Sequence, residues 1–354
     1  MSLEVQSHQG KYAAQFREGV FSELSTLDLT KKVFIVDSKV ARLYAKPLER
    51  ILSSGSVLRI EATEENKSLD QFTAYIESLV SLGVRRGDTL VAIGGGIIQD
   101  ITCFLAATMF RGLDWIFYPT TLLAQADSCI GSKSSINVGV FKNLLGTFTP
   151  PKQVLIDPVV LKTLSPAEIR SGVGEMLKIH IIDGPASFDQ IAADYDDVLA
   201  DSSYLLRYVY RSLEIKKNFI EKDEFDRGIR NVLNYGHSFG HAIEAATEFA
   251  VPHGVAVTLG MDMANYVAMR LGMSTQRHFE RMHPTLRKNY LGFEGFSVPF
   301  DLFLTGLSKD KKNSRDQLGL ILPGQDGIPA RGFYSKDARF IQFCEEYFAK
   351  VRAE

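Results

Sequence analysis

The sequence contains few residues of the kinds that stabilise small secreted proteins or anchor a chain in a membrane. Its 354 residues include one tryptophan and three cysteines (Cys103, Cys129 and Cys344), which form no CxxC pair. Neither a disulfide framework nor a thiolate zinc site is therefore expected. No apolar run approaches the roughly 18 residues of a transmembrane helix, and no secretory signal is recognisable. We therefore expect a soluble, cytoplasmic protein without a membrane partner.

The sequence also lacks an excess of charge of one sign. Its formal net charge is -2, with 23% charged and 45% hydrophobic residues. A chain of this kind has no global field that favours nucleic acid, so we expect no nucleic-acid partner. At this length, two domains are the default expectation.

The order of apolar patterns predicts an α/β domain followed by an all-α domain. Five short runs rich in β-branched residues are predicted strands: 32–37, 57–62, 89–96, 115–120 and 154–157. A helical pattern at 68–83 lies between the second and third of them, and such alternation favours a parallel sheet covered on both faces. From about Ser165 onward the patterns are helical, ending with a helix near 338–351. We place the domains at 1–160 and 161–354.

A glycine-rich turn follows the third predicted strand. The stretch "VAIGGGIIQD" includes Gly95 and Gly96 and leads into a helix that contains Asp100. Glycines allow the backbone to approach a phosphate, and the free N–H groups of a helix start favour an anion. This suggests a pyrophosphate site, although the turn is not the GxGxxG fingerprint and a simple tight connection has the same features. Asp37, at the end of the first strand, is suited to a ribose hydroxyl or to capping a helix.

Three of the seven histidines lie close together in "NYGHSFGHAIE" and the following "HGVAV". His237 and His241 have the i, i+4 spacing that places both on one face of a helix, and His253 follows a predicted turn. Open catalytic zinc sites use three nitrogen or oxygen ligands, and Glu175, beside two glycines, is a candidate carboxylate. The spacing predicts a metal site but leaves open which three groups bind.

Basic residues occur among glycine, serine and asparagine in the stretch 127–148. Lys133 and Lys142 lie in this turn-like sequence rather than on an amphipathic helix. Such a setting is typical of a pocket for an anionic substrate. Together with the glycine turn and the histidines, it suggests redox chemistry on a phosphorylated or carboxylated polyol.

Several ordered motifs together resemble the 3-dehydroquinate synthases and the wider sugar phosphate cyclases. They are "GGGIIQD", "RGLDWIFYPTTLLAQADSCIGSK", "FKNLLGTF", "GEMLK", "DEFDRGIRNVLNYGHSFGHAIE", "HGVAV" and "KDKKN". The resemblance covers about residues 30 to 325. It implies an N-terminal Rossmann-like parallel-sheet domain that binds NAD and a helical C-terminal domain that binds a divalent metal. The metal implied is zinc, with cobalt as an alternative, and a homodimer is implied as well.

The resemblance also implies roles for individual residues. The metal ligands would be Glu175, His237 and His253, whereas His241 would contact the substrate near its phosphate and assist proton transfer. The implied NAD contacts are Asp37, Glu64, Lys67, Gly95, Gly96, Asp100, Thr120, Thr121, Lys133, Lys142 and Thr163. The implied substrate and catalytic contacts are Asp127, Lys133, Lys142, Asn143, Lys178, Lys216, Arg230, Asn234, His241 and Lys311. Arg111 would reach the phosphate across a dimer interface.

The reaction that the resemblance implies is transient oxidation by NAD, β-elimination of phosphate, reduction, and an intramolecular aldol closure. Lys216, Arg230 and Asn234 match positions that handle a substrate carboxylate, which favours 3-deoxy-D-arabino-heptulosonate 7-phosphate. Alternatives are another sugar phosphate cyclase, acting on sedoheptulose 7-phosphate, glucose 6-phosphate or an amino analogue, and an NAD-dependent polyol dehydrogenase. A non-catalytic scaffold with the same fold is the remaining alternative.

The sequence departs from the family pattern at four positions. Gln99 replaces a usual glycine in the glycine turn, and Ser132 replaces one before Lys133. Phe141 stands where glycine usually precedes the Lys–Asn pair, and Asp226 replaces a usual glutamate. These changes bear on the exact substrate more than on the type of reaction.

Overall fold

The computed structural model describes residues 1–139, 141–310, 313–314 and 317–352. The chain forms two compact units. Unit 1 comprises Met1–Leu164 and Lys217–Phe225, and unit 2 comprises Ser165–Lys216 and Asp226–Glu354.

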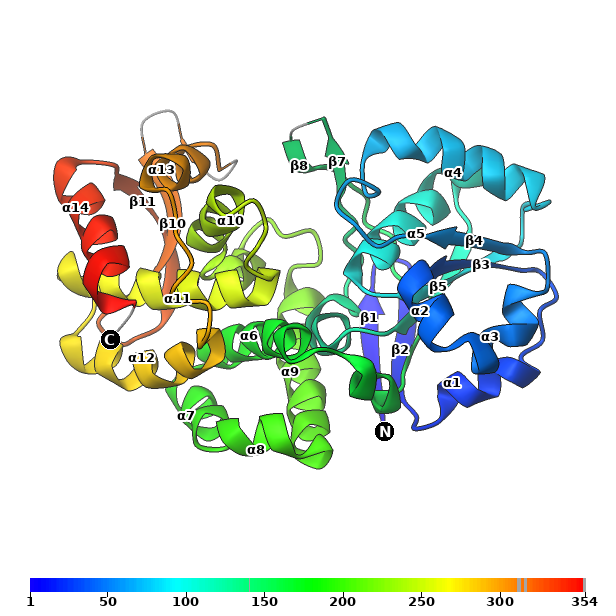
Figure 1. Cartoon of the computed structure of the whole chain (residues 1–354), viewed down its shortest axis with the longest axis horizontal. Helices are drawn as coiled ribbons and strands as arrows, with labels where there is room; N and C mark the ends of the chain where they lie inside the picture. The colour runs from blue at the N-terminus through cyan, green and yellow to red at the C-terminus, as the bar shows by residue number, and fades with distance from the viewer. Residues whose placement is uncertain (140, 311–312, 315–316, 353–354) are drawn as a thin grey trace. The chain divides into compact units, whose positions relative to one another are not determined.

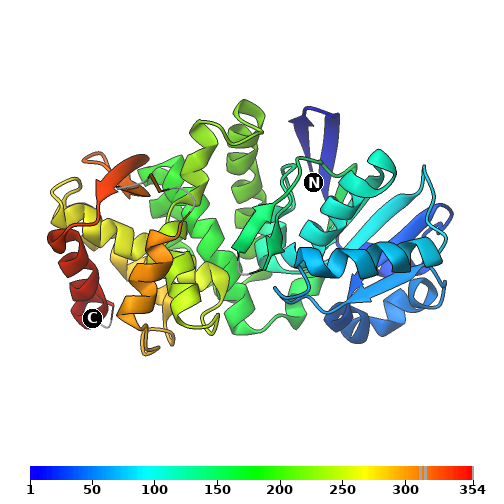
Figure 2. The same cartoon turned by 90° about the horizontal axis from the view of Figure 1, so that it is seen from above.

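Unit 1 contains a seven-stranded sheet in the order β1-β2-β9-β6-β5-β3-β4. Its strands are β1 Ser2–Ser7, β2 Gly10–Phe16, β3 Lys32–Asp37, β4 Val57–Ile60, β5 Thr89–Gly94, β6 Asp114–Pro119 and β9 Gln153–Ile156. All neighbours pair in parallel except β1 and β2, which form an antiparallel hairpin at the N-terminus (Figure 2). The five predicted strands all lie in this sheet, which confirms the predicted fold class for this part of the chain.

Helices cover both faces of the sheet (Figure 1). They are α1 Val20–Glu23, α2 Ser38–Leu43, α3 Ala45–Leu52, α4 Leu69–Ser81 and α5 Gly96–Thr108, with the short helices η1 Leu24–Thr26, η2 Met109–Arg111, η3 Ala124–Ser128 and η4 Pro158–Thr163. Residues of α1, α2 and α3 pack against Phe34, Val91 and Tyr118 in a buried apolar core. A small hairpin, β7 Ile136–Val138 and β8 Phe141–Leu145, follows η3. A strand buried on both faces needs a continuous apolar sequence, which explains why these strands were visible in the sequence.

The strand order places the glycine turn at a change of direction in the sheet. From β3 the chain moves outward to β4, and then returns to β5 and onward to β6 on the other side of β3. In open α/β sheets, ligands bind beyond the carboxyl ends of the strands at such a point. Asp37 ends β3 and Gly94 ends β5, so both lie at this edge.

Unit 2 is mostly helical, as predicted. Its elements are α6 Pro166–Asp183, α7 Pro185–Ala193, α8 Tyr195–Ala200, α9 Ser202–Lys222, η5 Ile229–Asn234, α10 His237–Ala246, α11 His253–Arg270, α12 Gln276–Tyr290, α13 Phe300–Ser308, α14 Ala338–Glu346 and η6 Tyr347–Val351, with the hairpin β10 Gln317–Pro323 and β11 Pro329–Ser335. The residues of α9 from Lys217 onward belong to unit 1. Helix α11 is buried along nearly all of its length, and α6, α10 and α12 pack around it. None of the helices in the described part of the chain has the length and apolar character needed to span a bilayer.

His180, on α6, is a buried histidine that we expect to make the stability of unit 2 sensitive to acid. Its Nδ1 lies 2.8 Å from the Ser187 Oγ, and burial lowers its pKa to about 4. The unfolded chain binds this proton at about pH 6.5, so stability is complete above that pH and falls as the pH drops toward 4. We expect His180 to account for a loss of up to about 3 kcal/mol over this interval. Urea unfolding followed by circular dichroism should show a smaller acid loss in His180→Asn than in the wild type.

Candidate active site

The candidate metal site in unit 2 is built where three helices approach each other closely. A side chain at Gly174 on α6 would overlap the carbonyl oxygen of Gly254 on α11, and the Gly254 N–H donates to the Ser171 Oγ at 2.9 Å. A side chain at Gly260 on α11 would likewise overlap the carbonyl oxygen of Gly236, next to α10. Glycine at these contacts lets the backbones touch. The contacts bring Glu175 of α6, His237 of α10 and His253 of α11 together.

The ring nitrogens and the carboxylate converge on one point. The Glu175 Oε1 lies 3.7 Å from the His237 Nε2 and 3.3 Å from the His253 Nε2. His237 is oriented by its Nδ1, which is 3.2 Å from the Tyr235 carbonyl oxygen. His241 is also close, because ligand atoms of all three histidines lie within 4.8 Å of one another. The geometry alone therefore admits His241 beside the predicted set of Glu175, His237 and His253.

The electrostatics of this cluster favour a cation. Burial alone would raise the pKa of Glu175, but the Lys178 ammonium, with which it forms an ion pair, and His253 outweigh burial and hold that pKa well below its usual range. Burial disfavours a charged His253 ring, but Glu244 and Glu175 outweigh it and raise the pKa of His253 to about 10. Two carboxylates thus create a negative potential at the ring. Two imidazoles with one carboxylate are the donors of an open zinc site, so these residues fit a divalent metal.

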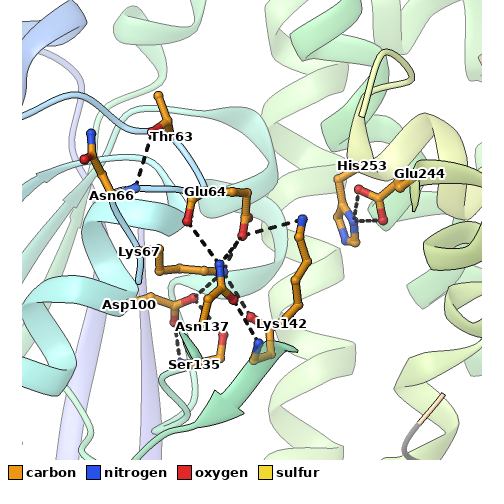
Figure 3. A network of polar contacts seen from close by, with 11 residues as sticks. Thr63, Glu64, Asn66, Lys67, Asp100, Ser135, Asn137, Lys142, Glu244 and His253 are labelled. Atoms are coloured by element: carbon orange, nitrogen blue, oxygen red, sulfur yellow. Dashed lines mark hydrogen bonds and ion pairs between the residues drawn. The ribbon is translucent and has the colours of Figure 1, made fainter. Parts of the chain in front are cut away.

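In unit 1, five predicted site residues join one polar network (Figure 3): Glu64, Lys67, Asp100, Lys142 and Asn143. The Lys67 Nζ is at its centre, 3.4 Å from the Asp100 Oδ2, 3.1 Å from the Asn143 Oδ1 and 3.5 Å from the Glu64 Oε1. Lys67 is 6% exposed. Burial alone would lower its pKa, but Asp100 and Glu64 raise it, so Lys67 remains an ammonium.

Ser135 and Asn137 belong to the same network, although the sequence predicts no role for either of them. The Ser135 N–H and Oγ donate to the Asp100 carboxylate at 3.0 and 2.9 Å. The Asn137 Nδ2 donates to the Glu64 Oε2 at 2.9 Å, while its Oδ1 accepts from the Asn143 N–H at 2.9 Å. Asn143 has a left-handed backbone (φ 53°), which this bond helps to hold. Both residues lie in a polar stretch without periodicity, so no sequence signal pointed to them.

The glycine turn lies at the carboxyl edge of the sheet. A side chain at Gly95 would press against Thr121, and the Thr120 N–H donates to the Gly94 carbonyl at 2.9 Å. Asp37 caps α2 by accepting from the Lys39 N–H at 2.8 Å, and burial raises its pKa. The ends of β3, β5 and β6 thus bring Asp37, Gly95, Gly96, Thr120 and Thr121 to one edge.

The remaining predicted residues belong to several elements, and Lys178 is the one that forms an ion pair with Glu175. Arg111 is in η2, exposed and with φ 67°, and Thr163 in η4 bonds with the Tyr44 hydroxyl at 3.0 Å. Asp127 is buried in η3, and Lys133, six residues later in the chain, is exposed. Lys178, Lys216, Arg230 and Asn234 belong to α6, α9 and η5 of unit 2. Lys311 lies outside the described residues.

The four positions at which the sequence departs from the family pattern differ in their burial and backbone conformation. Gln99 is 4% exposed and exchanges two hydrogen bonds of 2.6 Å with Ser128 of η3, so its bulk lies within the fold. Ser132 is buried, whereas the Phe141 ring is 64% exposed. Asp226 has a left-handed backbone (φ 57°).

Comparison with known proteins decides the family. The family model for the 3-dehydroquinate synthase N-terminal part matches residues 57–171, and that for the C-terminal part matches residues 172–313. The chain belongs to the 3-dehydroquinate synthase family. Members of this family named 3-dehydroquinate synthase include one from Microcystis aeruginosa, 37% identical over 85% of both chains, and one from Prochlorococcus marinus, 31% identical over 96% of this chain and 97% of the other.

Solved structures agree on the fold. A 2-deoxy-scyllo-inosose synthase, solved with carbaglucose-6-phosphate, NAD+ and Co2+, has a TM-score of 0.81 at 23% identity, covering 98% of this chain and 99% of that one. ValA, a 2-epi-5-epi-valiolone synthase from Streptomyces hygroscopicus solved with NAD+ and Zn2+, has a TM-score of 0.81 at 24% identity, covering 96% of this chain and 97% of that one. The synthase-family fold predicted from the sequence is confirmed.

Proposed function

We propose that this protein is a 3-dehydroquinate synthase, which converts 3-deoxy-D-arabino-heptulosonate 7-phosphate to 3-dehydroquinate and phosphate. The main structural support is the convergence of the Glu175 carboxylate with the His237 and His253 Nε2 atoms. Relatives that share 31 to 37% identity over most of their length have this name. The solved synthases whose names refer to other cyclisation products have a similar fold but share only 23 to 24% sequence identity with this chain.

We assign the metal site to Glu175, His237 and His253, and the metal to zinc, with cobalt as an alternative. When bound, the cation would supply Lewis-acid polarisation of the substrate alcohol, and NAD would supply reversible hydride transfer to and from the substrate. His241 is more exposed than these ligands and lies beside them. Its role in this proposal is to contact the substrate and to move a proton near the leaving phosphate.

We assign NAD binding to the domain at 1–160. The carboxyl edge of its sheet supplies Asp37 for a ribose hydroxyl, the turn at Gly95 and Gly96 for the pyrophosphate, and Thr120 and Thr121 beside it. The Lys67 network supports Glu64, Asp100 and Lys142 in defined orientations. Thr163 and Lys133 complete the proposed cofactor set.

We propose that residues from several segments bind the anionic groups of the substrate. Three of them are buried cations of the domain at 161–354: Lys178, Lys216 and Arg230 are 3%, 7% and 5% exposed. A buried charge requires a partner, which Glu175 provides for Lys178, so the assignment of these three cations to the substrate comes from their positions in the family motifs. The other proposed contacts are Asp127, Lys133, Asn143, Asn234 and Lys311, with Arg111 supplied across a homodimer interface.

The three buried cysteines, none in a disulfide, support a cytoplasmic location.

The decisive experiment measures phosphate release in the presence of NAD and zinc from three substrates. These are 3-deoxy-D-arabino-heptulosonate 7-phosphate, sedoheptulose 7-phosphate and glucose 6-phosphate. We expect fast release from the first without net formation of NADH. Release from only one of the others would reassign the protein to a different cyclase. Accumulation of NADH without phosphate would instead indicate a polyol dehydrogenase.

The role of Arg230 predicts how the enzyme distinguishes carboxylated from neutral substrates. We expect Arg230→Ala to lower kcat/KM for 3-deoxy-D-arabino-heptulosonate 7-phosphate by about 10²-fold or more, because an unpaired buried carboxylate costs several kcal/mol. Any residual activity on a neutral sugar phosphate should change much less. Arg227→Ala, at an exposed position of the same segment, is the matched control. Equal losses on both substrate types would contradict the carboxylate role.

A further inference from the structure

A second carboxylate lies against the His253 ring on the side away from Glu175. Both oxygens of Glu244 lie 3.2 Å from the His253 Nδ1 (Figure 3). The His253 Nε2 faces the Glu175 Oε1 at 3.3 Å. Glu244 itself is 9% exposed, so its charge is poorly screened by solvent.

The local fold holds this carboxylate in place. Glu244 is in the last turns of α10, and His253 begins α11 after the short connection 247–252. The Phe249 N–H donates to the Glu244 carbonyl at 2.8 Å. Glu248 and Phe249 both have left-handed backbones, with φ of 50° and 62°. Non-glycine residues keep such conformations only where the surrounding structure fixes them. The backbone of this connection is therefore held in one conformation.

An imidazole binds a metal only through a nitrogen that has lost its proton, and the partner of the other nitrogen decides which one that is. A carboxylate that accepts a bond from Nδ1–H leaves the Nε2 lone pair free and makes it more basic. His237 has the same arrangement with a neutral partner, the Tyr235 carbonyl. The two histidines therefore differ in the charge of the group that contacts Nδ1, which is a carboxylate for His253 and a neutral carbonyl for His237.

We propose that Glu244 is a positioning residue of the metal site, which holds His253 as the Nδ1–H tautomer and strengthens its Nε2 as a ligand. This inference rests on the proposed function, because it requires that Glu175, His237 and His253 bind the metal. Glu244 is not a further ligand of that ion. It contacts Nδ1, whereas the Nε2 atoms of His253 and His237 lie on the Glu175 side, 3.3 and 3.7 Å from the Glu175 Oε1.

The test compares zinc affinity in the full-length protein and three variants. Metal-free protein is titrated with zinc in competition with a chromophoric chelator. Glu244→Gln keeps the shape but removes the charge, and Glu244→Ala removes both. Glu248→Gln, an exposed glutamate in the same connection, is the matched control. The melting temperature of each metal-free protein shows whether the variant is folded.

We expect Glu244→Gln to weaken zinc binding by about 10-fold and Glu244→Ala by up to about 100-fold, with Glu248→Gln unchanged. In zinc-loaded wild type, the nitrogen NMR shifts of His253 should be those of a ring protonated at Nδ1. Zinc affinity within about twofold of wild type in folded Glu244→Ala would overturn the proposal, as would a His253 ring protonated at Nε2. A wild-type protein that binds no zinc would overturn the metal site itself, an outcome distinguishable from failure of Glu244 alone.

Discussion

Replacing His253 by alanine is expected to remove zinc and activity together. The variant loses one of three protein ligands, so we expect zinc affinity to fall by at least about 100-fold, more than the change of an outer-shell partner causes. Phosphate release should fall by about 10³-fold or more, because the metal contributes several kcal/mol to the reaction. Zinc content by atomic emission and phosphate release by a coupled assay measure the two effects in the same samples.

His241→Ala is the variant that makes this result decisive. His241 lies within 4.8 Å of the other two rings by its ligand atoms, but in the proposed mechanism it handles a proton and not the metal. We expect this variant to retain stoichiometric zinc while its turnover falls by about 10²- to 10⁴-fold, the usual contribution of a general acid or base. Loss of zinc from His241→Ala, with retention in His253→Ala, would replace our ligand set by one that contains His241.

The sequence predicted those parts of the fold that are buried on all sides. Strand β3 was predicted with its observed bounds, because parallel strands inside an α/β unit need uninterrupted apolar residues. The hairpin of β1 and β2 was not predicted, although Leu3 and Val5 alternate with polar residues as in a half-buried strand. In β2 the alternation is weaker in sequence, because Ala13 lies between the buried Tyr12 and Ala14. Strands β7 and β8 had no such signal, since β8 exposes most of its side chains.

Some residues of the candidate site were also predicted from the sequence, whereas others became apparent only in the structure. The residues alone indicated a histidine cluster with Glu175 as a candidate carboxylate, and the family motifs selected Glu175, His237 and His253 as the ligands. The glycine contacts of α6 and α11 bring Glu175 to the histidines. The sequence did not predict roles for Glu244, Ser135 and Asn137. Their residue types are common in any protein, and nothing near them in the sequence marks the partners that they contact in the fold. Nothing in the local pattern distinguishes Glu244 from an exposed glutamate such as Glu248. Only the fold of the α10–α11 connection turns it toward His253.

The second large effect concerns Asp100, whose removal should destabilise unit 1 as well as impair cofactor binding. Asp100→Ala leaves the Lys67 ammonium buried with weaker compensation from Glu64 and Asn143, and it leaves two Ser135 donors without their acceptor. Breaking a buried ion pair by removing one partner costs about 3–5 kcal/mol. The single tryptophan, Trp115 in β6, belongs to unit 1, so its fluorescence during urea unfolding reports on this unit.

Removal of both charges separates the electrostatic cost from the loss of packing. In the double variant Lys67→Met and Asp100→Leu the buried ion pair is removed as a whole, and Glu64 keeps Lys142 at 3.7 Å, so we expect the variant to regain more than half of the stability that Asp100→Ala loses. Asp70→Ala, an exposed carboxylate in the first turn of α4, should cost less than about 1 kcal/mol. A double variant no more stable than Asp100→Ala would show that the unpaired Lys67 charge is not the cause. If the double variant is stable but binds NAD weakly, the network is retained for orienting Glu64 and Lys142 toward the cofactor rather than for holding the unit together.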